Sequence, residues 1–471
     1  MSLFENIRNR LKYPTGKNSA LSKRIEEYHN TRSVRDRSLL CHAPFSNLYF
    51  NTEGDVALCW QTFHRAEKYS EEKSLKEIWN GLNFQRIREG IKNHELDFGC
   101  QACKNHLLEG NFTNILAKAY DNDFPKTDFP SIIEFELSNT CNLGCAMCNG
   151  MLSSVIRRDR EKMEPLKSPY GEKFLTELKE FIPHLHEARF NGGEPFLIKN
   201  YYRIWDMAFE LNPKMKMVVA TNGTVLNQKV KDYIARGNFH FNISMDGATK
   251  ETYESIRING DFDELMENFQ FFCDYCKTNH RTLCIMVNPL RQNWEEMPLF
   301  INFVNKHNVH IWFNTIMKPA EQALWSLPAE KLAGIYETLS SARLDAFSGG
   351  DKSIYNHNIK TYKNLVQQQI KTWLEQALSH NKRDSNGIVI HDDDTVRQKA
   401  ISKVVAYFSD REEDKKLVLH RIEETEKLIE RSLTDDYYKA LLDSNPETIL
   451  NYSKGHTPEG LSELFRKHIQ S

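Results

Sequence analysis

Short apolar runs alternate with amphipathic stretches over the middle of the chain. Between residues 129 and 320 the runs are rich in β-branched and aromatic residues, whereas the stretches between them repeat apolar residues at helical spacing. Strands that alternate with helices predict parallel pairing, so the fold class expected here is α/β, as an incomplete barrel or an open sheet. We predict strands at 131–137, 187–191, 216–221, 240–244, 282–287 and 309–314, and helices at 171–182 and 262–276.

The region before residue 129 has a different pattern. Residues 47–60 alternate apolar and polar positions around Glu53-Gly54-Asp55, which predicts a β-hairpin. Residues 74–91 carry apolar side chains at helical spacing, and Ser74 with Glu77 fits a capping box at the start of that helix. We therefore expect a small α+β domain in this part of the chain.

Strand signals nearly vanish beyond Pro319, and the remainder reads as mostly helical. Nine of the first 37 residues are Lys or Arg, which predicts a solvated basic arm or helix. The expected organisation is an arm at 1–37, a small domain at 38–128, the α/β domain at 129–320 and a helical region at 321–471.

Composition narrows the class of protein. The 471 residues carry 62 basic and 64 acidic side chains, so no global field attracts nucleic acid or an anionic membrane. The opening MSLFENIRNRLKYP lacks the apolar core of a secretory signal, and no run reaches the roughly 18 apolar residues of a membrane span. We expect a cytoplasmic protein with ten cysteines, for which a reducing compartment disfavours disulfides and favours metal or redox roles.

Three cysteines, Cys141, Cys145 and Cys148, follow the first predicted strand of the α/β region with C-x3-C-x2-C spacing. Ligands of parallel α/β folds collect at such strand ends. Thiolates suit iron–sulfur clusters or zinc, and three of them leave one iron of a [4Fe–4S] cluster without a protein ligand. Zinc with a remote fourth ligand and simple packing remain alternatives.

The order of further motifs resembles the radical S-adenosylmethionine (SAM) superfamily, whose members fold as a partial (β/α)6 TIM-type barrel. Asn191-Gly192-Gly193-Glu194-Pro195 is similar to the family's GGEP motif, and Thr221-Asn222-Gly223-Thr224 to its TNG motif. Ser244-Met245-Asp246-Gly247 resembles the family's pattern of serine, an apolar residue, aspartate and glycine, with Arg257 eleven residues beyond Asp246.

This resemblance implies a SAM site. Three thiolates would hold the cluster, the GGEP backbone would contact the SAM amino group, Ser244 and Asp246 would reach the ribose, and Arg257 would meet the SAM carboxylate. Met147 stands where the family usually has an aromatic residue, and Val287 and Asn288 are weaker candidates. The residues implied to bind SAM are Met147, Gly192, Gly193, Glu194, Pro195, Thr221, Asn222, Ser244, Asp246 and Arg257.

A second set of cysteines lies upstream. Cys41, Gly54, Cys59, Cys100 and Cys103 resemble the SPASM/Twitch auxiliary-cluster domain, whose pattern opens with C-x(9–15)-G-x4-C and continues to C-x2-C. In familiar relatives this module follows the barrel, whereas here it precedes it. The resemblance implies a second [4Fe–4S] cluster on Cys41, Cys59, Cys100 and Cys103, with tetrahedral zinc as the alternative and His42 or His64 as possible substitutes for a thiolate. Cys273, Cys276 and Cys284 are expected to be buried structural thiols.

The implied activity is reductive cleavage of SAM, with a 5′-deoxyadenosyl radical abstracting hydrogen from a substrate. The expected substrate is a peptide or protein residue, as for a peptide maturase, and flavodoxin or ferredoxin would donate the electron. A small-molecule substrate is the alternative within the class. A non-catalytic iron–sulfur or zinc scaffold, or an electron-relay protein, is the alternative outside it. An RNA substrate is disfavoured by the neutral net charge.

Overall fold

The computed structural model describes residues 20–32, 38–60, 62, 66–110, 112, 115–121, 128–317, 319–380, 393–409, 411–429, 434–444 and 446–470. The chain divides into two compact units, residues 1–371 and 372–471, and each is described by itself. The first unit contains the sheet and both cysteine sets.

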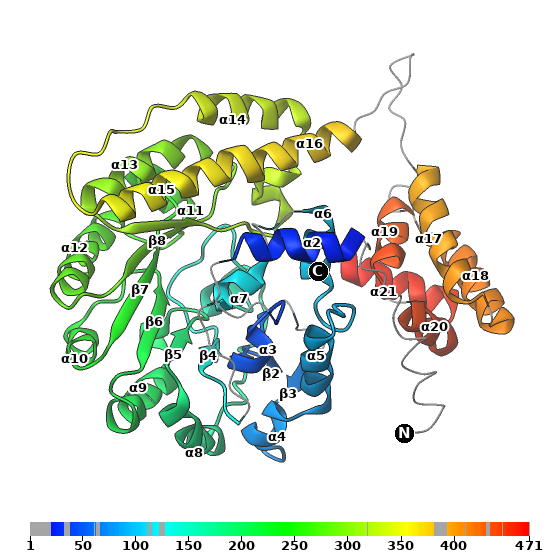
Figure 1. The fold of residues 1–471 in the computed structure, drawn as a ribbon, viewed down its shortest axis with the longest axis horizontal. Helices are drawn as coiled ribbons and strands as arrows, with labels where there is room; N and C mark the ends of the chain where they lie inside the picture. Colours follow the sequence, from blue (N-terminus) through cyan, green and yellow to red (C-terminus); the bar gives the residue numbers. More distant parts are fainter. Residues whose placement is uncertain are drawn as a thin grey trace. The chain divides into compact units, whose positions relative to one another are not determined.

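One nine-stranded sheet organises the first unit, in the order β3-β2-β1-β4-β5-β6-β7-β8-β9 (Figure 1). Seven of the strands, β1 and β4 to β9, pair in parallel. The strands are β1 Asn47–Phe50, β2 Asp55–Ala57, β3 Glu67–Lys68, β4 Ile132–Phe135, β5 Glu187–Phe190, β6 Lys216–Thr221, β7 Phe239–Ser244, β8 Leu283–Val287 and β9 His310–Phe313. The six strands predicted between residues 131 and 314 are confirmed, as is the partial TIM-type barrel.

Helices follow the parallel strands, and the longer of these helices lie on the outer side of the sheet (Figure 1). They are α7 Ser154–Asp159, α8 Glu172–Phe181, α9 Lys199–Leu211, α10 Gln228–Arg236, α11 Lys250–Ile256, α12 Phe262–Thr278 and α13 Met297–His307. Short 3-10 turns lie at η3 Ile182–His184, η4 Pro195–Leu197, η5 Trp294–Glu296, η6 Ala320–Gln322 and η7 Leu324–Ser326. Both helices predicted in this region are confirmed, as α8 and α12.

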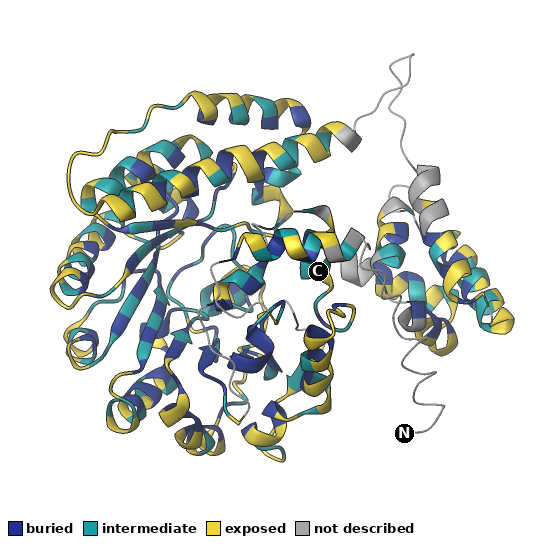
Figure 2. Ribbon diagram, viewed as in Figure 1, coloured by how far each residue is buried: buried dark blue, intermediate teal, exposed yellow. Residues whose placement is uncertain are grey.

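The core lies between the outer face of the sheet and these helices (Figure 2). In β6 and β7 fully buried residues alternate with half-buried ones, because successive side chains of a strand point to opposite faces. Phe135 and Phe190 contact each other and Tyr201 of α9 through tilted or edge-to-face rings, and Phe190 also contacts Trp205 edge to face. The opposite face of the strands, which carries Glu134 and Glu136, therefore faces the inside of the barrel.

The expected hairpin is confirmed as β1 and β2, but its tertiary role was not predicted. β1 pairs in parallel with β4, with Tyr49 opposite Glu134, so the small N-terminal module extends the barrel sheet. The capping box at Ser74 is present, with reciprocal hydrogen bonds to Glu77. The single helix predicted over 74–91 is wrong: α4 (Leu75–Trp79) ends at Asn80, and α5 (Leu82–Lys92) starts after Gly81.

Part of the N-terminal segment is integrated into the module rather than being a solvated arm. Helix α2 (Ala20–Asn30) packs against α6 (Gln101–Glu109), and Arg32 forms a buried ion pair with Asp121. Asp121 follows the turn η2 (Leu116–Tyr120), and the short helix α3 (Ala43–Ser46) precedes β1. Residues 1–19 and 33–37 of the predicted arm lie outside the described residues.

Helices also follow β9 within the first unit. They are α14 Ala329–Ser341, α15 Lys352–Asn364 and the π-helical turn η8 Leu365–Ile370, whereas α16 Lys371–His380 starts at the last residue of this unit and otherwise belongs to the second. The side chain of Asn358 donates to Val309 O and accepts from Ile311 N, so α15 covers the open edge of β9. The expected boundary near residue 320 thus falls inside the first unit.

The second unit is helical, as expected for this part of the chain. Its helices are α17 Asp393–Tyr407, α18 Glu412–Glu426, α19 Thr434–Asp443, α20 Pro446–Gly455 and α21 Pro458–Gln470. Phe408, Val418, Ile422 and Tyr438 belong to its own hydrophobic core. Among the residues that the structure describes, no helix in either unit is both long and apolar enough to cross a bilayer.

Candidate active site

The three-cysteine loop leaves the carboxyl end of β4 and is held by bonds from both sides. Gly144 N and Ala146 N donate to the carbonyl oxygens of Ile258 and Ile256, at 2.9 and 2.8 Å. Arg160 donates to the carbonyl oxygens of Cys145 and Cys148. Cys145 is buried, whereas Cys141 and Cys148 are half-buried. The loop therefore presents three thiols from a fixed backbone.

The Gly192-Gly193 turn after β5 lies directly against this loop. Gly193 N donates to Ser138 O at 3.0 Å, and Glu194 N donates to Thr140 O at 2.7 Å. A Cβ atom at position 193 would lie 2.2 Å from Thr140 O, a distance that no side chain tolerates. Glycine is thus required where the two backbones approach, and the turn and the thiol loop form one unit.

Glu194 links this turn to the end of β6. Its carboxylate is fully buried and accepts hydrogen bonds from Thr221 Oγ1 (2.8 Å), Asn222 N (2.8 Å) and Phe196 N (3.2 Å). Burial raises the pKa of Glu194 to about 7, although these hydrogen bonds act in the opposite direction. The side chain therefore holds two loops in register from inside the protein.

Asn142 completes the connection between the thiol loop and the third strand end. Its side chain accepts from Asn222 Nδ2 at 2.8 Å and donates to Thr224 Oγ1 at 2.9 Å. Asn142 was not predicted as a site residue, although it stands directly after Cys141. The only signal in the sequence was that Asn142 and Asn222 both carry amide side chains. The pairing of these two amides appears only in the folded chain.

Asp246 and Arg257 form a buried ion pair beside the cysteines. Asp246 Oδ2 accepts from Arg257 Nε (2.9 Å) and Nη2 (2.6 Å), and its Oδ1 accepts from the backbone and side chain of Asn288 (2.7 and 3.1 Å). Both carboxylate oxygens are thus engaged within the protein. Ser244 is half-buried at the end of β7, alternating with the buried Ile243.

Arg257 also reaches the cluster of thiols. Its Nη1 lies 3.8 Å from Cys145 Sγ. Burial raises the pKa of the Cys145 thiol, and the Arg257 charge opposes that shift. Burial also raises the thiol pKa to about 11 at Cys141 and to about 12 at Cys148. Such thiols lose their protons readily only when a metal takes the proton's place, so the donor set fits a thiolate-bound metal group.

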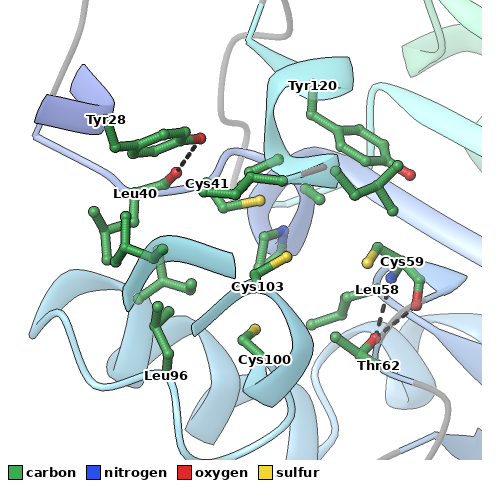
Figure 3. Close-up of a pocket in the computed structure, with 17 residues that line it drawn as sticks. Tyr28, Leu40, Cys41, Leu58, Cys59, Thr62, Leu96, Cys100, Cys103 and Tyr120 are labelled. Atoms are coloured by element: carbon green, nitrogen blue, oxygen red, sulfur yellow. Dashed lines mark hydrogen bonds between the residues drawn. The ribbon is translucent and has the colours of Figure 1, made fainter. Parts of the chain in front are cut away.

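Cys41, Cys59, Cys100 and Cys103 line one cavity in the N-terminal module (Figure 3). The remaining walls are apolar apart from three hydroxyl groups, each of which is hydrogen-bonded: Tyr28 to Leu40 O, Thr62 to Cys59 O and Tyr120 to Glu134 Oε1. Four soft ligands around an apolar chamber fit an iron–sulfur cluster. His42 is buried, and His64 lies outside the described residues.

The two thiol sets lie at opposite ends of β4. Ile132, the first residue of the strand, packs with Cys59, Ala43 and Tyr120, whereas Cys141 follows its carboxyl end. Four residues of strand span about 13 Å at about 3.3 Å per residue. The parallel pairing of β1 with β4 therefore fixes the position of the auxiliary cavity relative to the three-cysteine loop.

Glu136 is a second residue that sequence reasoning missed. It lies on the inner face just beyond β4, half-buried, and accepts a hydrogen bond from Tyr49 Oη at 2.7 Å. Burial raises its pKa to about 7.

Of the other thiols, Cys276 is buried and Cys273 and Cys284 are half-buried. Among the described residues, no three His, Cys, Asp or Glu side chains converge closely enough for a single metal ion.

Family models match both regions. The model of the radical SAM superfamily matches residues 135–304, which span the three-cysteine loop, the glycine turn and the Asp246–Arg257 pair. The chain contains a radical SAM domain. The SPASM model, an iron–sulfur cluster-binding domain, matches residues 41–104. The SPASM domain thus precedes the radical SAM domain and includes all four auxiliary cysteines.

Similar curated proteins carry different names. The chain is 29% identical to the AdoMet-dependent heme synthase of Methanosarcina barkeri, over 28% of this chain and 35% of that protein. It is 30% identical to the mycofactocin maturase MftC of Mycobacterium tuberculosis, over 30% and 34%. It is 20% identical to a GTP 3′,8-cyclase of Clostridium botulinum, over 40% and 57%. The chain thus spans between a third and three-fifths of the length of these relatives.

Among solved structures, SuiB of Streptococcus suis bound to S-adenosylmethionine is similar at 16% identity. The match has a TM-score of 0.34 and covers 61% of this chain and 64% of that one.

Proposed function

We propose that this chain is a radical SAM enzyme whose Cys141, Cys145 and Cys148 hold a [4Fe–4S] cluster with one iron open to SAM. When bound, the cluster and SAM supply reductive cleavage of the sulfonium and removal of a hydrogen atom from the substrate. The observation that carries the proposal is the interlocking of four strand ends around the thiols. Glu194 joins the GGEP and TNG segments, Asn142 joins the latter to the cysteine loop, and Arg257 reaches Cys145.

Hydrogen bonds within the protein already engage some of the groups expected to contact SAM and leave others as candidates for that contact. The N–H groups of Gly193 and Glu194 are engaged, so we assign the amino group of SAM, a donor, to carbonyl oxygens of this turn. Ser244 faces the inside of the barrel and remains the candidate for the ribose. Asp246 is better described as a positioning residue, because both of its oxygens hold Arg257 and Asn288.

Arg257 is proposed to serve both the carboxylate of SAM and the cluster. Asp246 fixes its guanidinium through Nε and Nη2, which leaves Nη1 directed at Cys145. A fixed positive charge beside Cys145 would favour the anionic end of SAM. Met147, half-buried in the loop, is the candidate for contact with the adenine.

Cleavage of SAM tests the core of this proposal. Anaerobically reconstituted protein should form 5′-deoxyadenosine from SAM and dithionite, measured by liquid chromatography and mass spectrometry. Cys145→Ala should abolish product, because one of three cluster ligands is lost. Cys276→Ala is the matched control, a buried cysteine on α12 away from the loop, and should retain activity. Retained cleavage in Cys145→Ala would place the cluster elsewhere.

For the substrate, we propose a peptide or protein residue. The name of the mycofactocin maturase supports this class, while the names of the heme synthase and the GTP cyclase support the small-molecule alternative. The discriminating experiment uses extract from cells of the source organism grown in deuterated medium, divided by size at about the mass of a short peptide. Deuterium in 5′-deoxyadenosine marks the fraction that contains the substrate. Loss of that label after protease treatment supports a peptide, and label from the small-molecule fraction refutes it.

The auxiliary cysteines are proposed to hold a second [4Fe–4S] cluster. Four thiols surround one chamber, so the cluster would be fully ligated and would carry electrons or support the fold rather than bind substrate. A reduced flavodoxin or ferredoxin is the proposed electron donor. Iron and sulfide analysis of the Cys141→Ala/Cys145→Ala/Cys148→Ala variant tests this assignment, since bound zinc without iron would replace it.

A further inference from the structure

We propose that helix α2 is the outer wall of the auxiliary site and that the buried Arg32–Asp121 pair latches it in place. The inference rests on the auxiliary cluster proposed above and concerns residues outside both family-model matches, which cover 41–104 and 135–304. Arg32 and Asp121 are thus positioning residues for a chamber whose ligands lie elsewhere.

Helix α2 supplies part of the chamber itself. Tyr28, on the last turn of α2, lines the cavity with its ring, and its hydroxyl donates to Leu40 O next to Cys41 (Figure 3). The same helix packs on α6, which carries Cys103. One side of the chamber is therefore formed by a segment that contributes no thiol.

Arg32 ties this wall to the turn η2. Its side chain is fully buried and donates to Asp121 through Nε (3.0 and 3.1 Å) and Nη2 (2.6 Å). Its Nη1 donates to Leu39 O at 2.7 Å, two residues before Cys41. Asp121 ends the turn that places Leu116, Ala117 and Tyr120 in the cavity lining.

The pair thus joins three segments that meet at the chamber: α2, the stretch before Cys41 and the turn η2. Removal of either partner leaves an unpaired charge inside the protein, which is relieved only when the segments separate and water enters. An open wall exposes the cluster to solvent and to small reagents. Closure of α2 therefore limits the access of solvent and small reagents to the auxiliary cluster.

The test uses the full chain with Cys141, Cys145 and Cys148 replaced by Ala, so that only the auxiliary cluster contributes iron. Release of iron to a coloured chelator is followed anaerobically. Arg32→Ala and Asp121→Ala should each release iron at least about tenfold faster than the parent, because loss of one partner of a buried pair is strongly destabilising. Arg24→Ala is the control, since Arg24 lies on the same helix in a half-exposed pair with Glu27 and should leave the rate unchanged.

Two further measurements separate a latch from a general loss of stability. Amide hydrogen exchange in Arg32→Ala should rise in peptides from 20–32 and 115–121 and stay unchanged in the barrel strands. The double variant Arg32→Met/Asp121→Leu removes both charges while keeping apolar volume, and should restore slow release. Equal release rates in parent, Arg32→Ala and Asp121→Ala would overturn the latch while leaving the cluster assignment intact. Absence of iron in the parent would overturn the cluster assignment, and the latch with it.

Discussion

The Asp246–Arg257 pair offers the sharpest test of how the site is supported. Asp246 has no exposed surface, and its carboxylate receives four hydrogen bonds, two from Arg257 and two from Asn288. Asp246→Ala removes all four acceptor contacts. It leaves the Arg257 guanidinium, which is itself buried, without a counter-charge.

Loss of one partner of such a pair costs about 3–5 kcal/mol, because the remaining charge is left desolvated. The double variant Asp246→Ala/Arg257→Met no longer contains that charge. It leaves only the donors of Asn288 unsatisfied, at about 1–3 kcal/mol. The double variant should therefore be more stable than the single variant, although it differs from the native chain at more positions.

Urea unfolding followed by tryptophan fluorescence measures this difference. Six of the seven tryptophans lie in the first unit, so the signal reports chiefly on the barrel. Asp159→Ala is the control, because Asp159 pairs with Arg158 at the surface and its loss should leave the midpoint unchanged. The claim that this ion pair stabilises the barrel would be refuted by either of two results. Asp246→Ala could be no more destabilising than Asp159→Ala, or the double variant could be less stable than the single one.

Three further predictions follow from single positions. Because burial raises the pKa of Glu136 to about 7, the native state holds a proton that the unfolded chain has lost between pH 4.5 and 7. The free energy of unfolding should therefore fall by up to about 3 kcal/mol as the pH rises from 4.5 to 7. In Glu136→Gln, the urea midpoint should no longer show this part of its pH dependence. Gly193→Ala should abolish SAM binding in calorimetry, because the new methyl group meets Thr140 O, whereas Gly334→Ala, in open space on α14, should bind normally. Phe408→Ala should destabilise the second unit by about 3–5 kcal/mol in calorimetric unfolding, and an unchanged transition would contradict its place in that core.

The sequence predicted the parts of this protein that depend on local pattern. All six barrel strands appear where apolar runs predicted them, because periodicity and β-branched composition act over a few residues. The capping box at Ser74 is likewise local, since its two bonds join residues three apart. The break between α4 and α5 was missed because the apolar spacing continues across Asn80-Gly81, although the backbone does not.

The candidate site shows the same division. Residue types and spacing were sufficient to nominate the three-cysteine loop, the glycine turn and Arg257. They could not show that both carboxylate oxygens of Asp246 accept hydrogen bonds from Arg257 and Asn288, or that Glu194 holds the loop after β6. The hydrogen-bond partners of these buried polar groups lie on elements far apart in the chain. A pattern of neighbouring residues therefore does not predict them.

By itself, then, the sequence determined the positions of the six barrel strands, the two sets of cysteines and the motifs that resemble the superfamily, since each depends on residues close together in the chain. Only the tertiary structure decided that β1 joins β4, and so where the SPASM domain sits against the barrel. It also decided that Arg32, one of nine basic residues in the first 37, is buried against Asp121. Strand pairing and the burial of a charge depend on which segments, far apart in sequence, contact each other. Packing of the whole first unit determines these contacts, and local residue preferences do not.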